Sequence, residues 1–383
     1  MADRKIFSRR NFMIGGSVIA MSGIGAVYYK FNERAPLGFE PTEALIHKGK
    51  QFLSKHISID IHAHPGRSFV AGAHDLNLQM RAYAATSLFE SRALKDMKRG
   101  GLTVASFATV SDFQLLEIGE MGITAAREFR PGEAWRSYQN QKDRIVSFSD
   151  HEGIRLIRSV GDINDTKNEN QMGILFTAEG GDFLEGKLER LEACYADGLR
   201  SITLVHYHIN EIGDIQTAPE KHKGLTDFGK AVVKSMNQIG MVIDLAHASK
   251  QTALDAIEIS SKPVVVSHAG INRSEFSHPR FIDLELARLV AENGGIIGAW
   301  PAGIGLSSLS DYIDQLFYLV DAVGVNHISI GSDMDGNYKP VYDNFDSLPL
   351  IAGMLLDRGM GEAGTAKVLG GNYLRLMASV SAI

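Results

Sequence analysis

Short apolar runs alternate with longer amphipathic segments along the chain from residue 57 onward. Val, Ile and Leu dominate the runs, whereas the segments between them repeat their apolar residues every three or four positions. Runs of the first kind are typical of buried parallel strands, and segments of the second kind are typical of helices. Eight runs occur: "ISIDIHAH" (57–64), "LTVASFATV" (102–110), "MGILFTAEG" (172–180), "LRSITLVHYH" (199–208), "GMVIDLAH" (240–247), "KPVVVSHAG" (262–270), "GGIIGAW" (294–300) and "HISIGSDMDG" (327–336).

Eight consecutive βα units predict an α/β protein with a (β/α)8 TIM barrel. An open doubly wound sheet is the alternative, but no G-x-G-x-x-G follows the first run, and eight units favour closure. We also expect a helix over residues 37–55 outside the barrel. The segment "LIAGMLLDRGMGEAGTAKVLGGNYLRLM" should add further helices after the eighth strand.

Residues that commonly bind metals stand at the ends of six of the eight runs. The carboxyl ends of the strands form the active-site face of such a barrel, so these side chains should meet there. Imidazoles and carboxylates without thiolates suit zinc or a similar divalent ion. The barrel would then be of the metal-dependent hydrolase type. The seven residues are His62, His64, Glu179, His206, His247, His268 and Asp333.

The set is large enough for two divalent metal ions. Glu179 is the natural bridge, because its two carboxylate oxygens can face two cations. A pair of ions generates hydroxide near neutral pH, which favours hydrolysis. Asp333 is our candidate general acid/base, whereas Asp335 should point to the other face of its strand. Two alternatives stay open: hydrated histidines at the end of the first strand, and a polar turn at "SDMDG".

Composition narrows the classes of function. The 383 residues are 44% hydrophobic and 22% charged, as in a soluble globular protein. The net charge of -6 provides no general basic field for nucleic acid. Cys194 is the one cysteine, which excludes an intramolecular disulfide and a cysteine-based zinc site.

The first 36 residues resemble an export segment and not a folded unit. A basic start is followed by an uncharged stretch over residues 11–29. Arg9 and Arg10 in "SRRNFM" resemble a twin-arginine signal, with a single membrane anchor as the alternative. We therefore expect residues 1–36 to be a signal or N-terminal anchor and residues 37–383 to form a single (β/α)8 metallohydrolase domain. That domain should be exported, either periplasmic or attached to the outer face of the cytoplasmic membrane.

Several blocks resemble the membrane (renal) dipeptidase family of the amidohydrolase superfamily. They are "LFTAEGG", "LRSITLVHYHINEIGD", "GMVIDLAHASKQTALDAIEISSKPVVVSHAGIN", "HPRFIDLELARLVAENGGIIGAW" and "HISIGSDMDG", in this order along the chain. The resemblance implies a zinc peptidase acting on dipeptides. Its metals would be held by the histidines of the first strand, by Glu179 as the bridge, and by His247 and His268.

The resemblance also assigns groups that touch the substrate. It places the substrate-contacting histidine at His206, the arginine that binds the substrate carboxylate at Arg280, and the catalytic aspartate at Asp333. The expected partner is a small dipeptide, with a lipid bilayer at the N-terminus and a second copy of the chain as further candidates. The alternative for Arg280 is a surface salt bridge.

One position departs from the family. These dipeptidases usually carry His-x-Asp on the first strand, and this chain carries His62-x-His64. The loss of a carboxylate at this position either lowers the affinity for one metal ion or makes Asp333 a compensating ligand. His-x-His also fits other amidohydrolases that cleave N-acyl amino acids, lactones or phosphoesters. A non-catalytic envelope binding protein is a third alternative.

The export hypothesis makes a direct prediction. A folded reporter fused behind residues 1–40 should leave the bacterial cytoplasm, and replacing Arg9 and Arg10 together by lysine should block its export. Cell fractionation measures the location of the reporter, and the unmutated fusion is the control. Export of the double-lysine fusion at the normal level would favour an ordinary anchor.

Overall fold

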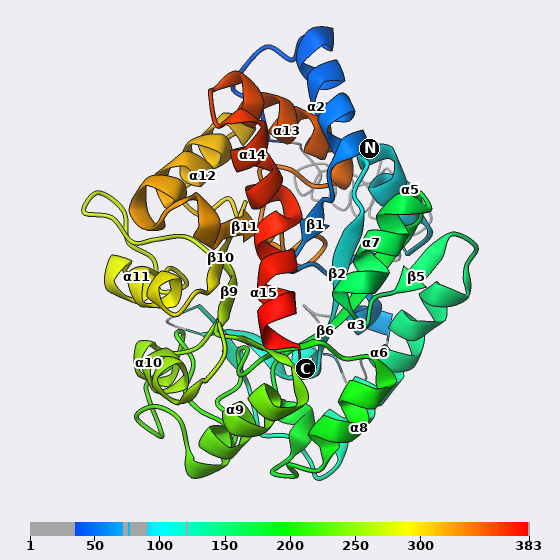
Figure 1. The fold of residues 1–383 in the computed structure, drawn as a ribbon. Helices are drawn as coiled ribbons and strands as arrows, with labels where there is room; N and C mark the ends of the chain where they lie inside the picture. Colours follow the sequence, from blue (N-terminus) through cyan, green and yellow to red (C-terminus); the bar gives the residue numbers. More distant parts are fainter. Residues whose placement is uncertain (1–34, 72–75, 77–89, 120–121, 382–383) are drawn as a thin grey trace, which may run out of the picture.

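A computed structural model describes residues 35–71, 76, 90–119 and 122–381, and its core is a closed parallel barrel (Figure 1). The strand order is β2-β1-β11-β10-β9-β8-β7-β6, and pairing of β2 with β6 closes the ring. The sheet is thus the predicted (β/α)8 TIM barrel. The barrel strands are β1 (Ile59–Asp60), β2 (Val104–Val110), β6 (Met172–Glu179), β7 (Ser201–Thr203), β8 (Val242–Asp244), β9 (Val265–Ala269), β10 (Ile296–Ala299) and β11 (Ile328–Ile330).

Every one of the eight apolar runs supplies one barrel strand, but most strands are shorter than their runs. Strand β1 pairs with β2 through Ile59 and Asp60, and the chain then leaves the ladder before His62. An isolated parallel bridge between Ala63 and Met334 continues the contact between the first and last strands. The ends of the runs therefore become loops on the carboxyl face, where side chains can turn toward the barrel axis.

Three further strands were not expected from the sequence. Strand β5 (Ile154–Leu156) pairs in parallel with the start of β6, beside the barrel. Strands β3 (Leu116–Gly119) and β4 (Gly122–Ala125) form an antiparallel hairpin. The hairpin contacts the carboxyl face, because Ala125 N donates to Tyr207 O at 3.0 Å and Thr217 Oγ1 donates to Ile123 O at 3.0 Å.

Helices surround the barrel and cover its N-terminal strand ends. They are α2 (Glu43–Lys55), α3 (Ser68–Ala71), α5 (Glu90–Gly100), α6 (Glu133–Ser147), α7 (Val160–Asn168), α8 (Arg190–Asp197), α9 (Asp227–Ile239), α10 (Lys250–Ile259), α11 (Leu284–Glu292), α12 (Leu309–Val323), α13 (Leu348–Asp357), α14 (Gly361–Ala366) and α15 (Asn372–Val380).

The helix expected over residues 37–55 begins later, at Glu43. Thr42 is its N-cap, and its side chain accepts a hydrogen bond from Leu45 N at 3.2 Å. The preceding residues are not helical because Pro36 and Leu37 instead accept backbone bonds from Leu309 and Ser310. Helix α2 packs against α13, outside the barrel, as predicted (Figure 1).

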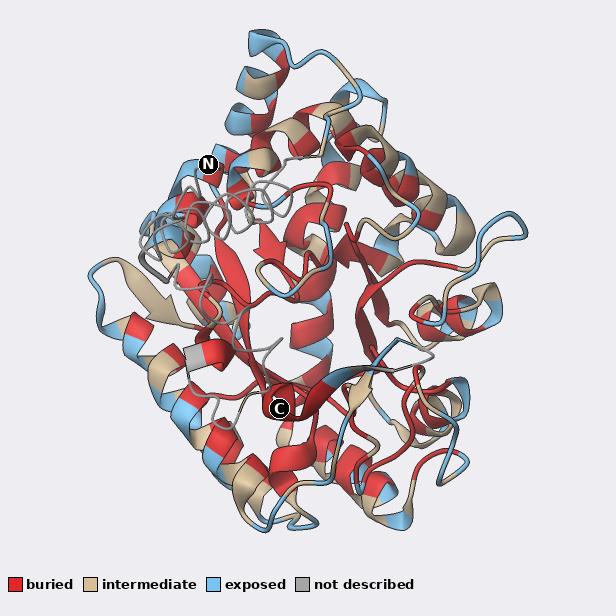
Figure 2. Cartoon of the chain, turned by 180° about the vertical axis from the view of Figure 1, so that it is seen from behind, coloured by how far each residue is buried: buried red, intermediate tan, exposed pale blue. Residues whose placement is uncertain are grey.

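Helix α15 closes the barrel at the amino ends of its strands (Figure 1). Tyr373, Leu376 and Met377 pack there in one buried cluster with residues of the strands, such as Val104 and Val265. The opposite, carboxyl face is seen in Figure 2, with largely buried strands behind it. This arrangement leaves one end of the barrel for chemistry.

The predicted export segment lies almost wholly outside the described residues, which begin at residue 35. Among the helices that the structure describes, none has the length and apolar character needed to cross a bilayer.

Candidate metal centre

The seven residues predicted at the strand ends meet in one buried cluster on the carboxyl face. None is more than 8% exposed. Glu179 ends β6 and His268 lies within β9, whereas the others stand on the loops that follow β1, β7, β8 and β11. The barrel thus brings together side chains separated by up to 271 positions, from His62 to Asp333.

Glu179 lies at the centre of this cluster. Its Oε1 is 3.3 Å from His62 Nε2, 2.9 Å from His247 Nε2 and 3.5 Å from His268 Nε2. Its Oε2 is 3.2 Å from His64 Nε2 and 3.5 Å from His206 Nε2. Asp333 joins from the loop after β11, with Oδ1 3.3 Å from His64 Nε2. One carboxylate therefore faces five imidazoles, with a different set at each oxygen.

The donor atoms fit divalent metal ions. Three groups of three have ligand atoms within 4.8 Å of one another: His62, His64 and Asp333; His62, Glu179 and His268; and Glu179, His206 and His247. The buried His62 Nε2 has no hydrogen-bond partner among the described residues, although it points into the cluster. His247 Nε2 and His268 Nε2 lie only 3.0 Å apart. Converging imidazoles with unused nitrogens are typical of a metal site.

The electrostatics of the cluster favour the ionisation states that bind metals. Burial lowers the pKa values of His247 and His268 well below the usual range, and the nearby charges of Arg280 and His62, respectively, lower them further. These two imidazoles are therefore neutral. Burial alone would raise the pKa of Glu179, but the neighbouring histidines hold it well below the usual range. Neutral imidazoles and an ionised carboxylate are the metal-binding forms.

His64 differs from the other ligands. Burial lowers its pKa, but hydrogen bonds to Asp333 and Glu179 outweigh burial and raise the pKa to about 10. A cation is therefore strongly favoured between these groups, and a divalent ion would displace the proton.

Two site residues have strained backbones. His247 has a φ of 65° and Asp333 a φ of 52°, in the left-handed region that side chains disfavour. Each such residue costs about 1–3 kcal/mol, so the surrounding structure must hold it in place. The strained turns bring the side chain of His247 to Glu179 and that of Asp333 to His64.

Arg280 reaches the same cluster from the loop after β9. It is 4% exposed, and its Nη2 lies 2.9 Å from His247 Nε2 and 3.1 Å from His268 Nε2. Its Nη1 donates to Gln216 Oε1, and the ring of Trp300 lies 5.3 Å from the guanidinium carbon. The alternative of a surface salt bridge is wrong, because the guanidinium is buried beside the candidate ligands.

Two residues that touch the site were not singled out in the sequence. Asp112 Oδ1 is 2.7 Å from His206 Nδ1, and its Oδ2 accepts a bond from Tyr207 N at 3.1 Å. Trp300 Nε1 donates to Asp333 Oδ2 at 3.2 Å. They follow β2 and β10, the two strands whose runs end without a ligand-type residue. Extending the second run by two positions would have found Asp112.

A second histidine after β7 forms a separate buried pair. His208 Nδ1 is 2.7 Å from Asp182 Oδ1, and its Nε2 is 3.0 Å from Glu128 Oε2. Burial lowers the pKa of His208, but Asp182, then the charge of Asp112 and the hydrogen bond to Glu128 outweigh it and raise the pKa to about 9. This pair ties the segment after the β3–β4 hairpin to the barrel.

Comparison with known proteins identifies the family of this chain. The family model described as membrane dipeptidase (Peptidase family M19) matches residues 47–383. The chain belongs to the membrane dipeptidase family. Relatives in this family include Dipeptidase verJ of Clonostachys rogersoniana, 30% identical over 246 residues that cover 62% of this chain and 63% of that protein. Dipeptidase 3 of Rattus norvegicus is 30% identical over 243 residues, covering 60% and 49%. The matched region thus spans about half to two thirds of these relatives.

Solved structures of two bacterial peptidases share the fold. The probable dipeptidase PvdM from Pseudomonas aeruginosa has a TM-score of 0.73 at 18% identity, covering 89% of this chain and 99% of that one. A metallopeptidase from Rhodobacter sphaeroides, liganded with a phosphinate mimic of the dipeptide L-Ala-D-Ala, has a TM-score of 0.71 at 19% identity, covering 85% and 99%.

The His208 pair predicts a pH-dependent contribution to stability. The pKa of His208 is about 9 in the folded chain and about 6.5 when unfolded. The pair should therefore stabilise fully below about pH 6.5 and lose its effect as the pH rises through 9. The free energy of unfolding of the wild type should exceed that of His208→Gln by on the order of 1–3 kcal/mol at pH 6.5, and by little at pH 10.

Urea unfolding at a series of pH values measures this difference. His47→Gln, an exposed histidine on α2, is the matched control. A difference between wild type and His208→Gln that stays constant from pH 6.5 to 10 would contradict the assignment.

Proposed function

We propose that this chain is a metal-dependent dipeptidase that hydrolyses the peptide bond of dipeptides with a metal-activated water, using two divalent ions, most simply zinc. The observation that carries the proposal is a buried guanidinium, Arg280, within hydrogen-bond distance of two imidazoles that face Glu179. A metal centre with a fixed cation beside it suits a small substrate that ends in a free carboxylate. The dipeptidase names of the relatives and the dipeptide mimic bound to the Rhodobacter enzyme support the same class.

The residues divide into two halves around Glu179. His62 and His64, with Asp333 beside them, would hold one ion. His247 and His268, whose Nε2 atoms lie 3.0 Å apart, would hold the other. Glu179 would bridge the two through its two oxygens. When bound, the ions supply an activated water and polarise the scissile carbonyl.

Three side chains, one of which is Asp333 itself, would act on the water or the substrate. Asp333, fixed by the indole of Trp300, would accept the proton of the water and deliver it to the leaving amine. Asp112 counteracts burial and raises the pKa of His206, which favours an Nε2–H that donates to the developing oxyanion. Arg280 would bind the terminal carboxylate by charge-assisted hydrogen bonds.

The raised pKa of His64 supports a particular view of the His-x-His departure. An imidazole removes one negative charge from the site, and Asp333 Oδ1 lies 3.3 Å from that imidazole. Asp333 is therefore placed to restore the missing charge as a ligand.

Location is part of the same proposal: the N-terminal twin-arginine-like segment supports an exported enzyme, periplasmic or held at the outer face of the membrane.

Purified wild-type chain should bind up to two zinc ions, and Glu179→Gln should weaken at least one of them by a factor of 10 or more. The glutamine amide lacks the negative charge with which the Glu179 carboxylate would offset the repulsion between two cations. Elemental analysis after dialysis against a chelator series measures the bound metal. Glu185→Gln, a glutamate outside the cluster, is the control, and equal metal content in Glu179→Gln and wild type would refute the bridge.

Asp333→Asn should lower kcat for dipeptide hydrolysis by about a hundredfold or more, because it removes the group that moves the proton. If Asp333 acts only as acid/base, both ions should remain. Loss of one ion from the variant would instead make Asp333 a ligand and leave proton transfer unassigned.

Dipeptides with a free C-terminal carboxylate should be cleaved at least about tenfold better, in kcat/KM, than their C-terminal amides. An unpaired buried arginine costs roughly 1.5–3 kcal/mol, which corresponds to this preference. Arg280→Ala should abolish the preference and leave the metals bound, and Arg273→Ala on the same loop is the control. Equal cleavage of amides, lactones or phosphoesters by the wild type would favour the wider amidohydrolase class.

A further inference from the structure

Two buried aspartates lie just before the metal centre on opposite sides of the barrel. Asp60 is the last residue of β1 and Asp244 is the last residue of β8, and each is 2% exposed. They precede the candidate ligands His62 and His247 by two and three positions. Neither belongs to the groups of side chains that could hold an ion.

Each carboxylate joins two neighbouring strand ends through one oxygen. Asp60 Oδ1 accepts bonds from His62 N at 3.3 Å and from Ser332 N, beyond β11, at 3.0 Å. Asp244 Oδ1 accepts bonds from Ala246 N at 3.0 Å and from Ser267 N, in β9, at 2.9 Å. In both cases one donor lies two residues further along the same segment, and the other lies on the adjacent strand or just beyond its end.

These backbone donors are immediate neighbours of the site residues. Ser332 precedes Asp333, and Ala246 precedes His247, which are the two site residues with left-handed backbones. Ser267 precedes His268 in the same way. The carboxylates therefore hold the peptides through which the chain enters the strained turns.

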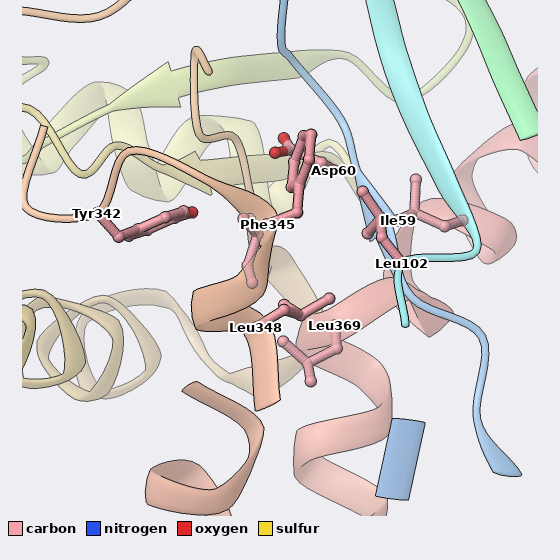
Figure 3. Close-up of a pocket in the computed structure, with 8 residues that line it drawn as sticks. Ile59, Asp60, Leu102, Tyr342, Phe345, Leu348 and Leu369 are labelled. Carbon is pink, nitrogen blue, oxygen red and sulfur yellow. The ribbon is translucent and has the colours of Figure 1, made fainter. Parts of the chain in front are cut away.

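Packing gives no separate reason for a charge at Asp60. Its side chain forms part of the wall of a small cavity whose other residues are mainly apolar (Figure 3). The Oδ2 atom of Asp60 has no hydrogen-bond partner among the described residues, and Oδ2 of Asp244 accepts a bond from Thr203 Oγ1 at 2.6 Å. A carboxylate in an apolar wall is unfavourable unless it makes strong hydrogen bonds, and the backbone amides of His62 and Ser332 supply two of them.

We infer that Asp60 and Asp244 are positioning residues, each of which aims one half of the metal centre. Asp60 orients His62 and Asp333, whereas Asp244 orients His247 and His268. The inference rests on the proposed two-ion function and adds to it that the halves are positioned independently, by the same device used twice.

The test measures the zinc affinity of the two halves separately. The full-length variants Asp60→Ala and Asp244→Ala remove the acceptor, while the two Asn variants keep an oxygen for the backbone amides. Zinc binding is followed by competition with a chromogenic chelator. Each Ala variant should weaken one zinc equivalent by about 10–100-fold and change the other by less than about threefold. Each Asn variant should weaken the same equivalent by less, because an uncharged acceptor still holds both amides.

Backgrounds with one half removed identify which ion responds. The variant His268→Ala keeps only the half of His62 and Asp333. In this background, adding Asp60→Ala should weaken binding of the remaining zinc by about 10–100-fold, and adding Asp244→Ala should change it little. In the His64→Ala background, Asp244→Ala should weaken the remaining zinc and Asp60→Ala should change it little. Such non-additivity is expected only where two residues serve one ion.

The control is Asp214, a buried aspartate that also accepts backbone amides, but those of Lys221, His222 and Gly224 in its own loop. Asp214→Ala should leave both zinc affinities within about threefold. Crystal structures of the metal-free variants add a readout that needs no zinc: Asp333 should move away from His64 in Asp60→Ala, and His247 away from Glu179 in Asp244→Ala.

The inference is overturned if either Ala variant, or the control Asp214→Ala, weakens both zinc equivalents equally. It is also overturned if each Asn variant weakens zinc binding as much as its Ala counterpart, which would indicate a role for charge alone. Should an Ala variant not fold, selective weakening of one equivalent in its Asn variant supports the inference, and unselective weakening overturns it. A wild-type chain that binds no second zinc overturns the proposed centre instead, and the crystal structures then decide the positioning role.

Discussion

The buried carboxylate of Glu179 is the constraint on which the rest of the site depends. An ionised carboxylate inside a barrel is strongly unfavourable unless cations or hydrogen-bond donors surround it. Here five imidazoles lie within 3.5 Å of its two oxygens, each from a different strand end except His62 and His64. Closure of the barrel is what brings these ends together, because an open sheet would leave its two edge strands far apart. The fold and the electrostatics of the site therefore require each other.

Two residues of the candidate metal centre have unfavourable backbone conformations, which hydrogen bonds from the surrounding barrel stabilise. The left-handed turns at His247 and Asp333 are each unfavourable by about 1–3 kcal/mol. Hydrogen bonds to a charged acceptor contribute about 1.5–3 kcal/mol each, and Asp60 and Asp244 each accept two beside these turns. The gains are of the size needed to keep both residues in place. Rigidity at the site thus comes from the strands and the residues just before it.

The sequence predicted the barrel and the seven clustered residues because both depend on periodicity. A buried parallel strand is a continuous apolar run, and a ligand at its end interrupts that run visibly. Asp112 and Trp300 were missed because only metal-ligand residues at the last positions of the runs were considered. Asp112 lies two positions beyond its run, and Trp300 ends its run but is not a metal ligand. Strand β5 is three half-buried residues, too short to show a pattern, and the β3–β4 hairpin carries few strand-forming residues. Long-range partners such as Asp112 and His206, 94 positions apart, are fixed only by the closed barrel.

The geometry at Asp333 limits how many roles that residue can fill. Its Oδ2 accepts the indole N–H of Trp300, so only Oδ1, which faces His64, is directed to the site. If Oδ1 binds an ion to replace the carboxylate that His64 displaces, the same oxygen cannot also carry the proton. In that case proton transfer is left unassigned, because His206, whose pKa Asp112 raises against the effect of burial, is the proposed donor to the oxyanion. The His-x-His start would therefore couple metal binding to proton transfer through Asp333, whose Oδ1 lies 3.3 Å from His64 Nε2.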